Sequence, residues 1–171
     1  RQKVSCDFIV LKNTPSHKWH RNCLNFLDDY TNKGFVFPCR KRSDAPDILL
    51  QWLNLTEPYC DGQSTHVECR TDNEATLIAG IFKQRADLSN VLTVTTCPYV
   101  HQQNPCERFN RTIENVTRYC LARSGVPLKY WDLAIKHANH VLDVLPSRAN
   151  NGFVSRYQLM TGRLPDLRKL K

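Results

Sequence analysis

The sequence lacks the features that mark membrane, repeat and zinc-finger proteins. No run of about 18 apolar residues occurs, so we expect no membrane-spanning helix. No internal repeat or low-complexity segment is present, which argues against solenoids and disordered linkers. No two cysteines form a C-x-x-C pair. We therefore interpret the 171 residues as one domain, with a core at about 4–146 and a C-terminal extension at 147–171.

Eight cysteines are scattered along the chain, at positions 6, 23, 39, 60, 69, 97, 106 and 120. Several lie within apolar runs, where a free thiol behaves as a small hydrophobic side chain, which indicates a reducing compartment. The even count and the N-x-T sequons at Asn54, Asn110 and Asn115 keep disulfides and secretion open as the alternative. Two of those asparagines fall on a predicted helix, which disfavours that alternative.

The chain carries a surplus of positive charge. Its 24 Lys and Arg residues against 16 Asp and Glu give a net charge of +8 and a pI of about 9.2. Such a surplus favours a polyanionic partner, most simply nucleic acid, because neutralising phosphates releases counterions. Many basic proteins bind no nucleic acid, so the charge alone does not decide the question.

The first third of the chain predicts an antiparallel meander. Apolar, strand-like runs occupy 4–10, 23–30 and 35–41, with a polar loop at 14–22 and a hairpin turn at Asn32-Lys33-Gly34. The first run is interrupted by Asp7, and a charge within a buried strand needs a reason, which a bound metal would supply.

The middle of the chain predicts helices that cross over to further strands. Helical periodicity occurs at 45–55 and 74–86, and β-rich runs occur at 65–71 and 91–96. A parallel neighbour needs such a crossover, so the predicted sheet is mixed and five-stranded, with helices on both faces.

The last third of the chain is predicted to form two long helices followed by a tail. From Asn104 an apolar stripe recurs at Phe109, Ile113, Val116 and Cys120. Residues 125–127 break that helix, and a second apolar pattern runs over 131–145 until Pro146 ends it. The tail is predicted to be mostly loop.

Three carboxylates in three different predicted elements suit a divalent cation. Asp7 lies in the first strand, Asp72 follows the fourth, and Glu107 lies in the first turn of the long helix. Hard cations prefer oxygen ligands held by rigid elements. Taken singly, Asp72 could be an ordinary turn residue, and Glu107 could pair with Arg111 at i,i+4 on a solvated surface.

Further residues, in the same order along the chain, carry a resemblance to a known family. They are Asp7, Phe26-Leu27-Asp28-Asp29-Tyr30-Thr31, Thr71-Asp72-Asn73, and then Pro98-Tyr99 … Gln102-Gln103-Asn104 … Glu107-Arg108 … Asn110-Arg111-Thr112. Together they resemble the integrase catalytic core of copia-type LTR retrotransposons. The resemblance covers Asp7 to about Leu170 and is most specific in the second half.

The resemblance implies an RNase H-like α/β fold and a polynucleotidyl transferase. Asp7, Asp72 and Glu107 would be both the catalytic residues and the ligands of two Mg²⁺ or Mn²⁺ ions about 4 Å apart. The implied reaction is 3′-end processing and strand transfer of retroelement DNA into target DNA. The implied partners are both DNAs and further copies of the chain, and the implied location is the nucleus, although no strong basic import cluster is present.

Six residues are expected to contact DNA. Amides and arginines on a loop and on the adjoining helix turn reach phosphates and groove edges. These residues are Tyr99, Gln102, Gln103, Asn104, Arg108 and Arg111. The alternative for the two arginines is that they only solvate the helix.

Three departures from the family pattern keep two rival functions open. Val10-Leu11 stands where the family has Gly-Pro, Glu74 stands where it has Gly after Asp-Asn, and Pro105 stands where it has Gly after Gln-Gln-Asn. One rival is a decayed or domesticated nucleic-acid-binding module on the same fold. The other is an RNase H-like nuclease that cuts without joining.

Two clusters imitate functional motifs. Asp28-Asp29 is interpreted as structural, because in the family this motif ends the second strand and binds no metal. His17-x-x-His20-x-x-Cys23 imitates a zinc spacing, but a structural zinc needs a fourth ligand, and no recognised zinc knuckle has this pattern.

Overall fold

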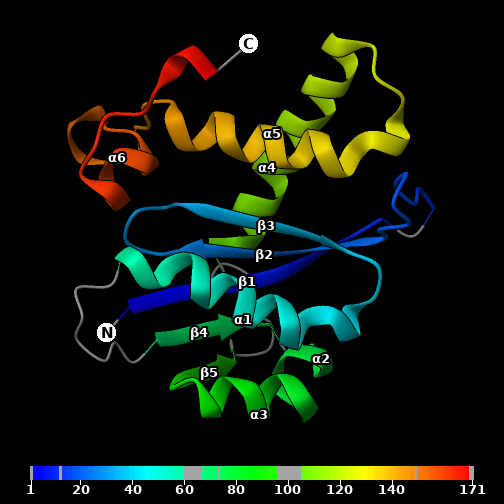
Figure 1. Ribbon diagram of the computed structural model, residues 1–171, viewed down its shortest axis with the longest axis vertical. Helices are drawn as coiled ribbons and strands as arrows, with labels where there is room; N and C mark the ends of the chain where they lie inside the picture. The colour runs from blue at the N-terminus through cyan, green and yellow to red at the C-terminus, as the bar shows by residue number, and fades with distance from the viewer. Residues whose placement is uncertain are drawn as a thin grey trace.

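A computed structural model describes residues 2–11, 13–59, 67–72, 74–95, 105–148 and 150–169. Its centre is a five-stranded sheet with the order β3-β2-β1-β4-β5 (Figure 1). The strands are β1 (Gln2–Val10), β2 (Asn22–Asp28), β3 (Gly34–Cys39), β4 (Val67–Thr71) and β5 (Val91–Thr95). The first three pair antiparallel, whereas β4 and β5 run parallel to β1, so the predicted mixed sheet is confirmed.

Helices cover both faces of the sheet. One face carries α1 (Ala45–Thr56), α2 (Ala75–Ile78) and α3 (Gly80–Leu88), and the other carries α4 (Pro105–Ser124) and α5 (Trp131–Val144), with α6 (Arg156–Thr161) beyond them. In Figure 1, α4 passes behind the sheet and continues past the edge strand β3, beside which α5 lies. Short 3₁₀ turns complete the chain at η1 (Arg42–Asp44), η2 (Glu57–Tyr59), η4 (Leu128–Tyr130), η5 (Asn151–Phe153) and η6 (Leu167–Lys169).

Each face of the sheet has its own apolar core. On the α1 side, Trp52 stacks on Phe26 with ring centroids 5.0 Å apart. On the α4 side, the core joins Ile9 of β1 to Ile113 of α4 and Ile135 of α5. The strands therefore alternate in the direction of their side chains, as a sheet buried on both faces requires.

Gly34 permits the close packing of three elements. A Cβ at this position would lie 2.2 Å from the ring of Phe109 on α4, a separation that no side chain can adopt. Asn139 of α5 donates from Nδ2 to the Gly34 carbonyl at 2.9 Å. The glycine therefore lets β3, α4 and α5 meet at one end of the edge strand.

Two predicted elements differ from the structure. The helix predicted over 74–86 is divided into α2 and α3, because Ala79 is extended and Gly80 has a φ of +63°. The tail predicted as mostly loop contains α6, which begins where the Ser155 hydroxyl accepts from the Gln158 amide and ends at a left-handed Gly162. Both residues are standard helix boundary signals.

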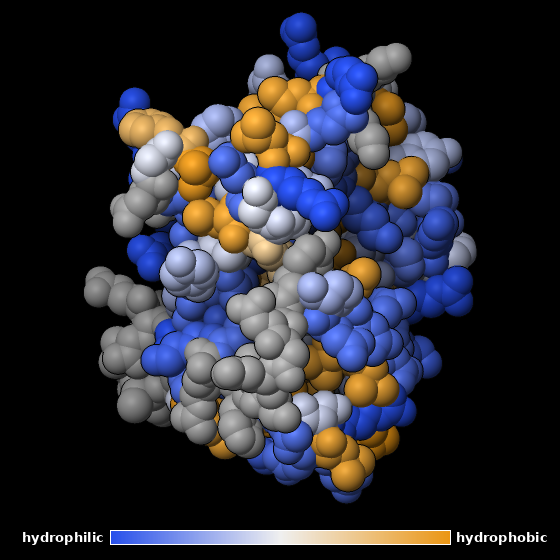
Figure 2. All heavy atoms as spheres, turned by 60° about the vertical axis from the view of Figure 1, so that its left-hand side comes forward, coloured by the Kyte–Doolittle hydropathy of each residue, from blue (hydrophilic) through white to orange (hydrophobic). Residues whose placement is uncertain are grey.

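The C-terminal segment forms part of an apolar surface. Figure 2 shows apolar side chains gathered in the upper half of one face, where α6 and the segment after it run. Leu145, Phe153, Leu164 and Leu167 are all exposed.

None of the described helices has the length and apolarity needed to cross a membrane. The six described cysteines are free thiols, and all except Cys120 are buried.

Candidate active site

Asp7 occupies the middle of the central strand and points toward α4. One carboxylate oxygen accepts the Phe8 amide at 2.7 Å, and the other accepts Nδ2 of Asn110 at 2.9 Å. Val4, Cys6 and Phe8 point to the opposite face, into the α1-side core. The alternation of β1 thus places a carboxylate on the α4 face, where the first turns of α4 reach the strand.

A buried amide network holds this carboxylate. Asn25 pairs with Asp7 across β1 and β2, is fully buried, and donates from Nδ2 to Oδ1 of Asn110 at 2.7 Å. The Cys23 thiol donates to Oδ1 of Asn25 at 3.1 Å. Asn25 was not predicted as a site residue from the sequence, and Asn110 stood out there only as a sequon and as part of the family motif. The one available signal was a polar Asn25 inside an otherwise apolar run.

Asp72 comes next to Asp7 through the parallel register of the sheet. Cys6 pairs with Thr71, the last residue of β4, so Asp72, which directly follows β4, is brought close to Asp7. Asp72 is half-buried, and its Oδ1 accepts the Glu74 amide at 3.2 Å.

Glu107 arrives from α4. It lies in the first turn, two residues after Pro105, and its side chain is 47% exposed. Its carboxylate lies 3.9 Å from Nη2 of Arg111, so the i,i+4 contact considered from the sequence is present. An exposed contact of this length is weak and leaves the glutamate side chain able to rotate.

The electrostatics show that these carboxylates act on one another. Burial and, after it, the Asp72 carboxylate raise the pKa of Asp7 from an ordinary 3.8 to about 7. The Phe8 amide opposes this rise, whereas Glu74 and Glu107 contribute to it. The structure therefore brings the three predicted carboxylates within electrostatic range of one another. Concentrated, poorly neutralised negative charge of this kind is common at functional sites.

Glu74 is a fourth carboxylate, known from the sequence only as a departure from the family pattern. Burial raises its pKa, while the guanidinium of Arg42, with which it forms an ion pair, lowers it. Arg42 belongs to η1 and also lies over the Phe8 ring, 5.7 Å from its centroid. The pair thus connects the turn before α1 with the end of β4.

The oxygen atoms of Asp7, Asp72 and Glu107 are of the type that a hard divalent cation binds. The three side chains do not lie close enough together to bind one ion. All the predicted ligands supply carboxylate oxygens from separate elements, the type of donor that Mg²⁺ prefers. Within the described ranges, no three His, Cys, Asp or Glu side chains lie close enough together to hold a metal ion. The assignment of Asp7, Asp72 and Glu107 as metal ligands stays a prediction.

The predicted DNA-contacting residues fall into two groups. Tyr99, Gln102, Gln103 and Asn104 lie outside the described residues. Arg108 and Arg111 are exposed on α4, in the same turns as Glu107. Their position is compatible both with DNA contact and with simple solvation of the helix.

The two imitating clusters make structural contacts. Asp28 is buried and accepts both the amide and the hydroxyl of Thr31, which holds the β2–β3 turn. His17 and His20 each place Nδ1 about 3 Å from the buried carboxylate of Asp132 on α5, at 3.1 and 3.0 Å. The loop between β1 and β2 is thereby fixed to the start of α5.

Sequence relatives of this chain are found among transposon polyproteins. It is 22% identical over 157 residues to the retrovirus-related Pol polyprotein from transposon RE1 of Arabidopsis thaliana, and 22% identical over 153 residues to that from transposon RE2. The alignments cover 91% and 89% of this chain, which spans 10% of the length of each polyprotein. No family model matches the chain.

Solved structures with a similar fold include retroviral proteins. The simian T-cell lymphotropic virus intasome in complex with a PP2A regulatory subunit matches 96% of this chain and 56% of its own, with a TM-score of 0.74 and 18% identity. The HTLV-2 integrase catalytic core domain with magnesium, in its dimeric form, matches 93% and 94%, with a TM-score of 0.67 and 19% identity. The RNase H-like fold is thereby confirmed. Through its transposon relatives and its fold, the chain is confirmed to resemble the integrase core of retrotransposons.

Proposed function

We propose that this chain is the catalytic core of a DNA integrase that carries out metal-dependent phosphodiester transfer. Water would be the nucleophile in trimming the 3′ end, and the new 3′-hydroxyl would attack target DNA in strand transfer. The observation that carries the proposal is Asp7, whose pKa is raised to about 7 by burial and by the nearby carboxylates of Asp72, Glu74 and Glu107. A buried carboxylate with acidic neighbours gains most from a divalent cation.

Different residues of the chain would bind the metal ions and orient their ligands. Asp7, Asp72 and Glu107 would hold the metal ions, and Asn110 would hold the Asp7 carboxylate in orientation. When bound, two Mg²⁺ ions would activate the attacking hydroxyl and stabilise the leaving oxygen. The buried Asn25–Asn110 pair would keep the site rigid, since positioning to within about 0.5 Å is needed for such chemistry.

DNA binding and assembly follow from the same proposal. Tyr99, Gln102, Gln103 and Asn104, together with the exposed arginines of α4, would contact phosphates and bases. Because similar cores are known in dimeric and trimeric forms and in an intasome, we expect this chain to act as a homo-oligomer on both element ends and target DNA. Its place of action would be the nucleus.

A joining assay on a branched DNA that mimics the integration product tests the chemistry. With Mg²⁺ or Mn²⁺, the wild-type chain should reseal the target strand, and Asp7→Asn, Asp72→Asn and Glu107→Gln should each lower the rate by about 100-fold or more. Glu114→Gln is the matched control, because Glu114 is also on α4 and also pairs with an arginine at i,i+4. It should keep wild-type activity.

Metal binding gives a readout independent of turnover. Added Mg²⁺ should lower the pKa of Asp7, measured by NMR titration, and should raise the melting temperature of the wild-type chain. The rise in melting temperature should be absent in Asp7→Asn. A wild-type chain that is folded and binds DNA but neither joins strands nor responds to Mg²⁺ would refute the enzymatic proposal.

A decayed nucleic-acid-binding module is the second candidate, and the Arg42–Glu74 ion pair favours it. Glu74 of this pair stands where the family pattern has a glycine, so a charged residue lies beside Asp72.

The nuclease alternative is distinguished by its reaction products, because a nuclease would hydrolyse duplex DNA or an RNA–DNA hybrid and form no joined strand.

A further inference from the structure

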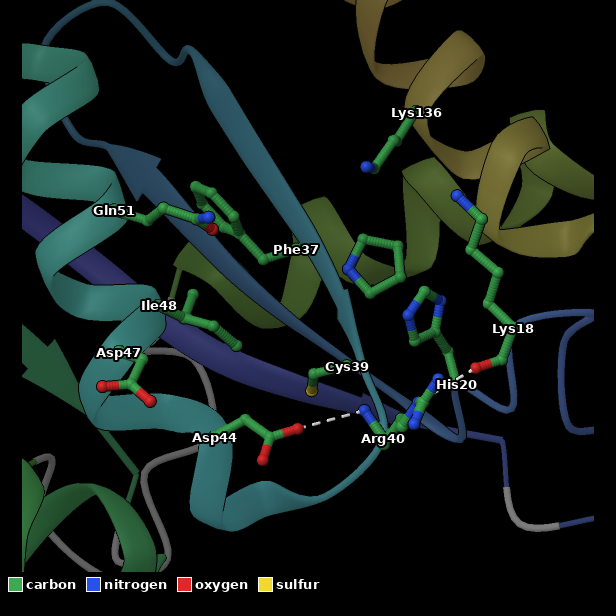
Figure 3. A pocket seen from close by; sticks show the side chains of 11 residues that line it. Lys18, His20, Phe37, Cys39, Arg40, Asp44, Asp47, Ile48, Gln51 and Lys136 are labelled. Atoms are coloured by element: carbon green, nitrogen blue, oxygen red, sulfur yellow. Dashed lines mark hydrogen bonds between the residues drawn. The ribbon is translucent and has the colours of Figure 1, made fainter.

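A pocket lies at the open edge of the sheet, away from Asp7. It has a volume of about 490 Å³ and is formed by the loop before β2, by β3, by α1 and by α5. Figure 3 shows Lys18, His20 and Lys136 on one side of β3, and Asp47, Ile48 and Gln51 on the other. Strand β2 lies between β3, which forms part of this pocket, and β1, which carries Asp7. We call it the edge pocket.

Basic side chains from three separate elements converge on the edge pocket. They are Lys18 and His20 of the β1–β2 loop, Arg40 after β3, and Lys136 of α5. In the described part of the chain, Lys18, Arg40 and Lys136 form no ion pair with a carboxylate, and Nε of Arg40 donates only to the Lys18 carbonyl at 3.2 Å. Unpaired cations gathered around a hollow produce a local positive potential that attracts anions.

The acidic residues of the edge pocket have other partners. Asp44 accepts the amides of Arg40 and Lys41 at 3.2 and 3.0 Å, which caps the start of η1. Asp47 pairs with Arg85 of α3 at 2.6 Å. Their charges are therefore partly neutralised within the fold, whereas those of the lysines are not.

His20 is held in one orientation. Its Nδ1 lies 3.0 Å from the Asp132 carboxylate, whose side chain is 3% exposed and also accepts the Ser16 hydroxyl at 3.0 Å. The Ser16 hydroxyl in turn accepts the His20 amide at 3.2 Å. This buried support fixes the ring beside the lysines, with Nε2 left to meet a ligand.

The edge pocket also has apolar walls. Phe37, Pro38 and Ile48 line it, and Pro38 offers no amide hydrogen at this point of the edge strand. A concave site with apolar walls and a few convergent polar groups is typical of small-ligand sites, and about 490 Å³ lies within their usual range. We propose that the edge pocket binds a compact phosphate-bearing anion of about nucleotide size.

The concave form distinguishes such a ligand from a DNA duplex. A duplex is contacted by cations spread along a surface. Here the cations line one hollow, with Lys18, His20 and Lys136 together on one side of β3, and Asp44 and Asp47 border it on the α1 side. The proposal does not depend on the proposed catalytic function, because none of the carboxylates assigned to catalysis lines this pocket.

Calorimetric titration with inorganic pyrophosphate tests the proposal. Metal-free buffer prevents recruitment of pyrophosphate by cations near Asp7. We expect one site per chain and at least a tenfold loss of affinity in Lys18→Ala/Lys136→Ala. Lys3→Ala/Lys83→Ala removes the same charge from two positions outside the edge pocket, an exposed one and a half-buried one, and should stay within twofold of wild type.

A single substitution guards against misfolding of the double variant. Gln51 is exposed on α1 and lines the edge pocket, so Gln51→Glu adds a negative charge there with almost no change in shape. It should weaken pyrophosphate binding several-fold without lowering the melting temperature. The absence of saturable binding to the wild-type chain, or equal losses in both lysine pairs, would overturn the proposal.

Duplex DNA provides the second arm. If affinity for a duplex of about 20 base pairs is unchanged in Lys18→Ala/Lys136→Ala, the edge pocket is a separate anion site, as proposed. The other outcome is that Lys18→Ala/Lys136→Ala binds the duplex with tenfold lower affinity and that pyrophosphate displaces the duplex from the wild-type chain. In that case these cations bind the DNA backbone, and the compact-ligand proposal is wrong.

Discussion

The two faces of the central sheet differ in chemistry although the same strands supply both. On the α1 side, β1 contributes Val4, Cys6 and Phe8 to an apolar core. On the α4 side, the same strand contributes Ser5 and Asp7, and Asp7 enters a network of buried amides. Both faces have an apolar core, to which β1 contributes Ile9 on the α4 side, but the α4 face also carries a charged, hydrogen-bonded site.

This difference teaches where mutations should act. The α1 face gains from apolar burial and close packing, so cavities should be costly there. The α4 face contains groups whose burial is unfavourable unless every partner is present, so the loss of one partner or a change of pH should matter most there.

Truncating Trp52 should produce the largest effect. Trp52 is fully buried and stacks on Phe26, so Trp52→Ala should lower the free energy of unfolding by about 3 to 5 kcal/mol, measured by urea denaturation. Trp52→Phe is the matched control. It keeps an aromatic ring and removes an indole N–H that has no hydrogen-bond partner among the described residues, so it should cost far less. Equal losses in both variants would show that the face is not packed as described.

The pH dependence of stability should identify Asp7 as the unfavourable charge of the α4 face. Its pKa is about 7 in the folded chain and 3.8 ordinarily, so the folded state binds this proton more tightly. The resulting stabilisation is complete below pH 3.8 and is lost as the pH rises to about 7. Across this range, the wild-type chain should lose up to about 4 kcal/mol relative to Asp7→Asn.

Comparing the two chains at each pH removes effects that do not depend on pH, such as the altered hydrogen bond to Asn110. Metal-free buffer is needed because a divalent cation would stabilise the charged carboxylate. Parallel stability curves between pH 4 and 8 would contradict the assignment.

Removing Asn110 should produce a smaller loss. Asn110→Ala leaves Nδ2 of Asn25 and one oxygen of Asp7 without their partner, at a cost of about 1 to 3 kcal/mol. It should also raise the pKa of Asp7 further, because a hydrogen bond to the charged form is lost. Asn115→Ala, on the exposed side of the same helix, should change neither quantity. If Asn110→Ala changes neither the stability nor the pKa of Asp7, the amide network does not hold Asp7.

The sequence predicted the sheet and the long helices because each carries a clear period. The stripe from Phe109 to Ile113 and the β-rich runs specify which faces are buried. The division at Ala79–Gly80 and the short α6 were missed because local backbone geometry, not hydrophobic pattern, determines them.

The sequence predicted which residues belong to the site, but not how the fold brings them together. Asp7 and Asp72 meet only through the parallel register of β1 and β4, and the roles of Asn25 and Arg42 depend on contacts across 85 and 32 residues of sequence. The edge pocket likewise unites Lys18 with Lys136, which no local pattern connects.

Replacing Glu74 should produce the smallest effect and sharpen the account of the α4 face. Glu74→Gln removes a negative charge that raises the pKa of Asp7 and frees the positive charge of Arg42. Both changes favour the ionised carboxylate, so the pKa of Asp7, followed by NMR, should fall by less than about one unit. Glu57→Gln, an exposed change of equal charge, should leave it unchanged. If both variants lower it equally, net charge rather than proximity sets the pKa of Asp7, and Glu74 does not belong to the site.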